Sequence, residues 1–251
     1  MMKTIGNLER PLLELQGVSK FFGGLVALDG VDVKVCTGEI VGLIGPNGAG
    51  KTTLFNVISG SHRPDLGKVF LQGNDITGLK PHRTCYEGIA RTFQIPKPFL
   101  RLTVLENMMV GAYFGSRLSR RKETFEKIIE ILHWAGLESK TLMPAESLNL
   151  VERKKLEVAR ALSTNPKLIL LDEVIAGLNP TEGSEMISFV TKLRASGLTI
   201  FMIEHLMKVI MNLSDRIVVL HYGKKLCEGL PEEVANNPEV IEAYLGVRAN
   251  A

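Results

Sequence analysis

One segment near the start of the chain combines glycines with a lysine and a threonine. Gly45, Gly50, Lys51 and Thr52 match the pattern G-x-x-x-x-G-K-[ST] at every fixed position. Glycines let successive backbone N–H groups of such a loop converge on phosphate oxygens, and a following helix adds its positive N-terminal end. The segment predicts a phosphate-binding loop made of Gly45, Pro46, Asn47, Gly48, Ala49, Gly50, Lys51 and Thr52, with Thr53 next to it.

Lys51 and Thr52 are the residues of this loop whose side chains act on phosphate chemistry. A lysine in this position reaches the β- and γ-phosphates of a nucleoside triphosphate, and the hydroxyl after it ligates Mg²⁺. The alternative is a chance glycine-rich turn. Apolar residues 40–44 predict a strand before the loop, and residues 52–58 predict a helix after it. This setting favours the phosphate loop.

Two carboxylates end a short apolar run in the second half of the chain. Residues 168–171 are all apolar, and Asp172 and Glu173 follow them directly. A buried strand delivers side chains to its carboxyl end, where open α/β sheets bind their ligands. We expect Asp172 to hold Mg²⁺ through water and Glu173 to act as a general base worth about 10²–10⁴ in rate. The alternative, a solvated acidic turn, is less favoured beside a phosphate loop.

Alternating strand-like and helix-like segments surround these residues and predict an α/β fold with a mainly parallel sheet. Strands are expected at residues 31–35, 40–44, 168–171, 199–203 and 216–220. Helical spacing predicts two inward faces, Phe125, Ile128, Ile129 and Leu132 in one helix and Met186, Phe189, Val190 and Leu193 in another. Thr103 and Glu106 have the spacing of a helix capping box.

Composition excludes several classes of protein. The chain of 251 residues has a net charge of +3, too balanced to argue for nucleic-acid binding, and its 3 cysteines suit no disulfide framework. No apolar run approaches the roughly 20 residues of a membrane helix. Residues 1–10 lack the apolar core of a signal peptide. We therefore expect a cytoplasmic protein that reaches a membrane only through a partner. The basic residues 153–155 are expected on a solvated face.

With these motifs the chain resembles the ATPase subunits of ABC transporters over nearly its full length. The resemblance implies one ABC ATPase domain over residues 1–251 with a P-loop NTPase (RecA-like) fold. Residues 1–94 and 163–251 then form the nucleotide-binding core, which includes an antiparallel β subdomain. Residues 95–162 form a helical insertion lobe that carries the signature region.

The resemblance also implies roles for three residues outside the loop. Phe22 corresponds to the aromatic residue that stacks on adenine, with Phe21 as an adjacent rival. Gln94 corresponds to the glutamine that reaches the nucleotide and Mg²⁺ from the helical lobe, and His205 to the histidine that contacts the γ-phosphate. Taken alone, they read as a core aromatic, a solvated loop residue and a structural histidine. Their order around Lys51 and Asp172 favours the functional roles.

The family signature Leu-Ser-Gly-Gly-Gln is degenerate in this chain. The residues aligned with it before a helix predicted at 153–162 are Leu148, Asn149, Leu150, Val151 and Glu152. Side chains replace glycines where backbone must approach phosphate closely, and Glu152 adds negative charge. Because such domains pair head to tail around two ATP molecules, we expect a heterodimer in which this chain offers a weakened signature. The alternative is that Asn149 and the helix N-terminus suffice.

Further similarity points to the ATPases of branched-chain amino-acid importers. It is carried by Arg91-Thr92-Phe93-Gln94, Leu102-Thr103-Val104-Leu105-Glu106-Asn107, Ala176-Gly177-Leu178-Asn179-Pro180 and the ending Tyr244-Leu245-Gly246. It implies an Mg·ATP-hydrolysing subunit on the inner face of the membrane. The implied partners are integral-membrane permeases, a second ABC ATPase subunit and, indirectly, an extracytoplasmic solute-binding protein. The alternatives are a soluble ABC ATPase acting on nucleic acid or ribosomes and an ATP-binding module with little turnover.

Overall fold

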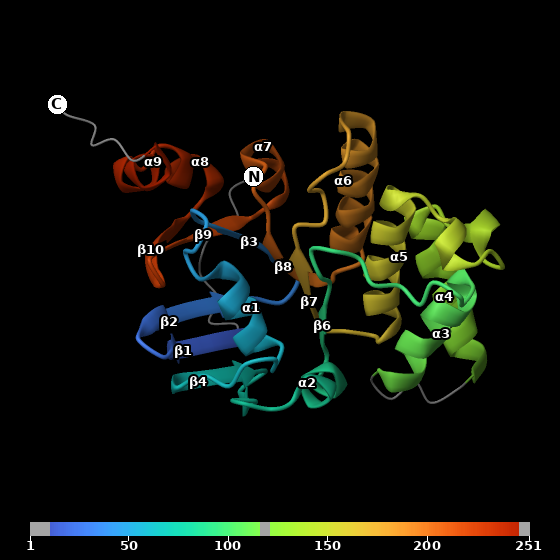
Figure 1. The fold of residues 1–251 in the computed structure, drawn as a ribbon, viewed down its shortest axis with the longest axis horizontal. Coiled ribbons are helices and arrows are strands. Elements are labelled where there is room, and N and C mark those ends of the chain that lie inside the picture. Colours follow the sequence, from blue (N-terminus) through green and yellow to red (C-terminus); the bar gives the residue numbers. More distant parts are fainter. Residues whose placement is uncertain (1–10, 116–120, 246–251) are drawn as a thin grey trace.

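The larger of two sheets forms the centre of the molecule (Figure 1). The structure, a computed structural model, describes residues 11–115 and 121–245, so residues 1–10, for which no signal peptide is expected, lie outside it, as does Gly246. In the described part the larger sheet has the strand order β10 (Lys224–Gly229), β9 (Arg216–His221), β3 (Ile40–Ile44), β8 (Thr199–Ile203), β7 (Leu168–Asp172) and β6 (Ile89–Arg91). Neighbours are parallel except β10 and β9. The predicted parallel sheet is confirmed.

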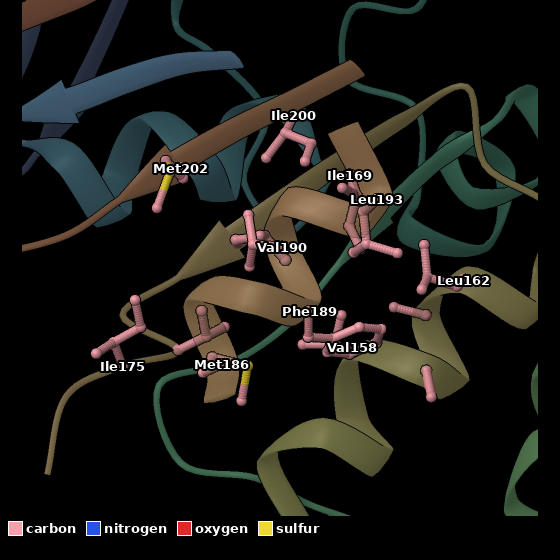
Figure 2. Packing of buried hydrophobic residues seen from close by; sticks show 14 of the residues in the cluster. Val158, Leu162, Ile169, Ile175, Met186, Phe189, Val190, Leu193, Ile200 and Met202 are labelled. Carbon is pink, nitrogen blue, oxygen red and sulfur yellow. The ribbon is translucent and has the colours of Figure 1, made fainter. Parts of the chain in front are cut away.

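The central strands are buried on both faces, which explains their continuous apolar sequences. In β7, Ile169 and Leu171 pack into one hydrophobic cluster and Leu168 and Leu170 into another. The first cluster includes α6 (Pro180–Ala195), whose predicted inward face is buried as expected. Figure 2 shows Met186, Phe189, Val190 and Leu193 of this helix against the sheet and against Val158 and Leu162.

An antiparallel sheet covers the other face together with α1 (Lys51–Ile58). Its strand order, within the residues described, is β2 (Leu25–Val35), β1 (Leu13–Phe22), β4 (Leu66–Leu71) and β5 (Asn74–Asp75). Leu54, Phe55 and Ile58 of α1 share this core with Val41 and Phe201 of the parallel sheet. The core therefore holds the phosphate-loop helix between the two sheets.

Helices α3 (Val104–Phe114), α4 (Arg121–Ala135) and α5 (Leu150–Ser163) pack together at one end of the molecule (Figure 1). The capping box of Thr103 and Glu106 begins α3, as predicted. The predicted face of α4 is partly wrong, because Phe125 is exposed and the buried side includes Ile131 beside Ile128 and Leu132. The other described helices are α2 (Pro81–Glu87), η1 (Glu138–Lys140), η2 (Ala145–Ser147), α7 (Met207–Leu213), α8 (Pro231–Ala235) and α9 (Pro238–Leu245). Across residues 11–115 and 121–245, no helix is long and apolar enough to cross a membrane.

Helix α5 differs from expectation in two respects. It begins at Leu150, because Asn149 caps it by accepting a hydrogen bond from the Glu152 N–H while the Glu152 carboxylate accepts one from the Asn149 N–H. Lys154 and Lys155 are buried, with 6% and 9% of their surface exposed. A solvated face was the wrong prediction for these two lysines.

Candidate nucleotide-binding site

The parallel strands bring residues far apart in sequence to one edge of the sheet. The phosphate loop follows β3, Glu173 follows β7, and His205 lies two positions after the end of β8. A cavity of about 370 Å³ opens at this edge. Its lining combines a hydrophobic wall with the loop and the strand ends, and consists of Phe22, Leu25, Val26, Ala27, Asn47, Gly48, Ala49, Gly50, Lys51, Thr52, Thr53, Glu173 and His205. Most of the residues predicted from sequence therefore meet in one hollow.

The phosphate loop needs glycine at two positions. Gly50 has φ +102°, and a Cβ there would lie 2.5 Å from the Ala27 carbonyl oxygen. Gly45 has φ +153°, and a Cβ there would lie 2.2 Å from the Leu220 carbonyl oxygen. The Lys51 ammonium donates to the carbonyls of Gly45 at 2.6 Å and Pro46 at 2.9 Å, so the loop is wrapped around it. Burial lowers the pKa of Lys51, an effect that the charges of Glu173 and Asp172 oppose.

The Glu173 carboxylate lies between two polar side chains. Gln94 Nε2 donates to Glu173 Oε2 at 2.5 Å, and His205 Nε2 contacts the other carboxylate oxygen. Glu173 itself has φ +50°, a left-handed conformation that is uncommon for a residue with a side chain. The backbone thus turns sharply after β7 and aims the carboxylate at the cavity. Gln94, Glu173 and His205, to which the sequence assigned separate roles, therefore lie in direct contact in the structure.

Asp172 forms a buried ion pair that we did not expect. Arg91 Nη2 lies 2.9 Å from Asp172 Oδ2, and the two side chains are 7% and 6% exposed. Arg91 Nη1 also donates to Asn56 Oδ1 at 2.6 Å, which links β6 to the phosphate-loop helix. Burial raises the pKa of Asp172, and the Arg91 guanidinium opposes that rise. The arginine therefore orients this carboxylate and opposes the effect of burial on its pKa.

Oxygen donors suited to a divalent cation occur on three elements around the loop. Thr52 offers a hydroxyl, Gln94 an amide oxygen and Asp172 a carboxylate, which is the hard-oxygen set that Mg²⁺ prefers. The hydrogen bond to Glu173 uses the Gln94 amide nitrogen and leaves its oxygen available. The residues present therefore fit Mg²⁺ in their chemistry.

Of the two remaining predicted nucleotide contacts, Phe22 lies in the cavity and Asn149 lies outside it. Phe22 lines the cavity and is 43% exposed, with its ring held edge-on to His62 at a centroid distance of 5.3 Å. Asn149 lies at the N-terminus of α5, which packs with α3 and α4, and is not part of the cavity lining. Its amide oxygen is used in capping, and its amide nitrogen stays available as a donor. Glu152, expected to add negative charge there, is paired with Lys140.

Two buried charged residues, Lys154 and Glu204, form hydrogen bonds with the backbone that follows Asp172. Lys154 donates to backbone carbonyls just after Asp172, and Glu204 Oε1 accepts from the Ile175 N–H at 3.0 Å. Glu204 is 2% exposed, and its Oε2 has no hydrogen-bond partner among the residues that the structure describes. Burial raises the pKa of Glu204 to about 7. Negative charge on Glu173 adds to that shift, while the bond from Ile175 and the charge of Lys154 oppose it.

Glu204 makes stability depend on pH. Between its ordinary pKa of 4.5 and about 7, the folded chain keeps a proton that the unfolded chain releases, so its contribution to stability falls as pH rises through that window. The neutral variant Glu204→Gln lacks this dependence. We expect the unfolding free energy of Glu204→Gln minus that of wild type to increase by up to about 3 kcal/mol between pH 5 and pH 8. Urea denaturation measures both values. The exposed control Glu185→Gln should show a constant difference, and a constant difference for Glu204→Gln would contradict the assignment.

Sequence reasoning overlooked Arg91, Lys154, Glu204 and Tyr244. The signal for Lys154 was its position, three residues after Val151 and four before Val158, which is a buried position of an amphipathic helix. Arg91 ends a strand of otherwise apolar residues. Tyr244, at the end of α9, accepts a hydrogen bond from the Gly45 N–H at 2.7 Å, and no sequence pattern links these two residues.

A phosphate loop and strand-end carboxylates on a parallel sheet define a P-loop nucleotide-binding domain. The ABC transporter family matches residues 28–176, and a second family, described as branched-chain amino acid ATP-binding cassette transporter, matches residues 224–250. The chain belongs to the ABC transporter family of ATP-binding proteins, and is an ATPase with the P-loop fold predicted from its sequence.

Relatives match over almost the whole chain. The high-affinity branched-chain amino acid transport ATP-binding protein BraF of Pseudomonas aeruginosa is 39% identical over 95% of this chain and 99% of its own. The probable branched-chain amino acid transport ATP-binding protein LivG of Archaeoglobus fulgidus is 40% identical, with 94% and 96% covered. The crystal structure of the ADP conformation of MJ1267, an ATP-binding cassette of an ABC transporter, matches with a TM-score of 0.85 at 35% identity, covering 95% of this chain and 100% of that one.

Proposed function

We propose that this chain is the ATP-hydrolysing subunit of an importer for branched-chain amino acids. The observation that carries the proposal is the enclosure of Glu173 between Gln94 and His205, beside a complete phosphate loop. Relatives named for branched-chain amino acid transport support the substrate class, since they match at 38–40% identity along nearly the full length. The C-terminal match over residues 224–250 supports it independently.

ATP binds with its phosphates in the loop and its adenine on Phe22. Glu173 accepts a proton from water as the water oxygen attacks the γ-phosphorus, and the bond from that phosphorus to the β-γ bridging oxygen breaks, giving ADP and phosphate. Gln94 orients the carboxylate, while His205 and Lys51 donate to the phosphoryl oxygens. Thr52, Asp172 and Gln94 would hold Mg²⁺, which would supply charge neutralisation for the phosphates.

A groove between the core and the helical lobe is the proposed docking site for a membrane permease. A hollow of about 350 Å³ lies between α3, α5 and the end of β6. Its rim carries exposed aromatic side chains, Phe93, Phe99 and Phe114, that are 50%, 49% and 70% exposed. Phe93 on the rim is followed directly by Gln94, which donates to the Glu173 carboxylate. A permease segment bound in this groove would therefore move Gln94 and, through it, the Glu173 carboxylate. In this proposal the chain is cytoplasmic, and the solute-binding protein lies across the membrane.

The second subunit of the closed dimer is proposed to be a different ABC ATPase. Leu150 and Val151 occupy the first turn of α5, where the family signature has glycines. The helix N-terminus still presents free N–H groups, so the segment is weakened and not abolished. A partner with a complete signature would then serve this chain's phosphate loop. ATP-driven closure of the pair, transmitted through the groove, is the step coupled to transport.

Uptake of labelled leucine in a strain lacking this chain tests the proposal. We expect deletion to abolish high-affinity uptake of leucine, isoleucine and valine, and the wild-type chain to restore it. Glu173→Gln should fail to restore uptake although it is produced in equal amount, whereas the control Glu185→Gln should restore it. Unchanged high-affinity uptake of all three amino acids after deletion would refute the proposed substrate class.

A further inference from the structure

Lys154 holds the peptide that follows the catalytic strand. Its ammonium donates to three backbone carbonyls, those of Glu173 at 3.3 Å, Val174 at 3.2 Å and Ala176 at 2.6 Å. An ammonium has three N–H bonds, so the three acceptors use its full donor capacity. The side chain enters from α5, which belongs to the helical lobe and not to the strand-end loops.

The backbone after Asp172 needs side chains as hydrogen-bond partners, because it is no longer part of a strand. Strand β7 ends at Asp172, and Glu173 then adopts φ +50°. Buried carbonyls without a hydrogen-bond partner are costly, and Glu173 to Ile175 are all buried. Glu204 Oε1 accepts a hydrogen bond from the Ile175 N–H in the same peptide. The backbone that aims the Glu173 carboxylate is therefore held by Lys154 and Glu204 from separate elements.

The same lysine lies two residues after the degenerate signature segment, which ends at Glu152. Asn149 caps α5, and Lys154 follows in the second turn of that rigid helix. Any displacement of the α5 N-terminus thus reaches the Glu173 carbonyl through one side chain. We propose that Lys154 is a positioning residue for hydrolysis, tying the helix that carries the signature segment to the peptide that carries Glu173. The link to a partner's nucleotide rests on the proposed dimer, whereas the effect on Glu173 does not.

Substitution of Lys154 by methionine separates positioning from general stability. Methionine keeps much of the apolar stem and removes all three donors. A displacement of about 1 Å in a catalytic group costs up to about 10²-fold in rate. We expect kcat for ATP to fall roughly 10- to 100-fold, with the dissociation constant for ATP within about twofold of wild type. Turnover is measured in the assembled transport complex, and ATP binding on the purified chain.

Hydrogen exchange on the purified chain distinguishes a positioning role of Lys154 from a general contribution to stability. In Lys154→Met, faster exchange should be confined to the amides of residues 174–177, including the Ile175 N–H. The neighbouring Lys155, which pairs with the exposed Glu185 at 2.6 Å, gives the matched control Lys155→Met, expected to keep wild-type kcat and exchange. Unchanged kcat in Lys154→Met, or faster exchange throughout the chain, would overturn the inference.

A second variant covers the possibility that Lys154→Met does not fold. Lys154→Arg keeps the charge, but its planar guanidinium does not bring three N–H groups to these carbonyls from a single atom. We expect a several-fold loss of kcat with unchanged ATP affinity, and wild-type kcat in this variant would also overturn the inference. Wild-type complex that hydrolyses ATP without importing amino acids would refute the proposed function and leave this result intact.

Discussion

Glu173→Gln is expected to lower ATP turnover by about 10²–10⁴-fold while ATP binding persists. The amide keeps the shape of the carboxylate and its contacts with Gln94 and His205, so the cavity stays intact. What disappears is the group proposed to accept the proton of the attacking water. Phosphate release measures turnover, and binding of a fluorescent ATP analogue measures affinity. Turnover within a few-fold of wild type would contradict the role of Glu173 as the base.

The same variant reports which partner closes the site. Blocked hydrolysis should trap any ATP-dependent dimer, detected by size-exclusion chromatography with light scattering. A monomer that binds ATP is the result expected for an obligatory heterodimer. A dimer that forms only with ATP would contradict the heterodimer, because it would mean that the Asn149 segment still serves as a signature. Glu185→Gln, an exposed carboxylate on α6, is the control for general effects of charge loss.

Arg91→Met is expected to destabilise the fold by about 3–5 kcal/mol, the usual cost of leaving one charge of a buried pair alone. Asp172 would lose its ion pair inside a side-chain environment only 6% exposed, and Asn56 would lose a donor. For a chain of this size, that corresponds to a melting temperature lower by roughly 6–20 °C. Differential scanning calorimetry at pH 8 measures it. A shift below about 2 °C would contradict the expected cost of leaving Asp172 buried without its partner.

A double variant isolates the charge from the packing. Arg91→Met combined with Asp172→Asn removes both charges, so no uncompensated carboxylate stays buried. We expect the double variant to recover much of the melting temperature lost by Arg91→Met. Because burial already raises the pKa of Asp172, the single variant should also be less destabilised at pH 5, where Asp172 accepts a proton more readily. Equal melting temperatures for the single and double variants would assign the loss to packing.

Much of this architecture was predictable because its signals are local. The phosphate loop has a fixed spacing, β3 and β8 have continuous apolar sequences, and the inward face of α6 repeats at helical period. Gln94 and His205 were placed by their order along a known motif series, and the structure brings both to Glu173. The local sequence pattern therefore predicts a helix or strand correctly where the burial of its apolar residues is enough to determine it.

The buried charges were not predictable, because each depends on a partner distant in sequence. Arg91 meets Asp172 only after β6 and β7 pair, and Lys154 meets its carbonyls only when α5 packs beneath the β7 end. A run of basic residues is normally solvated, so residues 153–155 misled the prediction. The start of α5 was set too late for a related reason, since the cap at Asn149 depends on the reciprocal bond with Glu152.

The Arg91–Asp172 ion pair also bears on the order in which the site fills. One oxygen of the Asp172 carboxylate is already engaged by a guanidinium, so a free dication approaching it meets a fixed positive charge. The triphosphate brings the negative charge that offsets both cations. In the proposed site, binding of metal and binding of nucleotide would therefore be thermodynamically linked, each strengthening the other by the same factor. If Asp172 holds Mg²⁺ as proposed, the chain would therefore take up metal and nucleotide more readily as a preformed complex than as separate species.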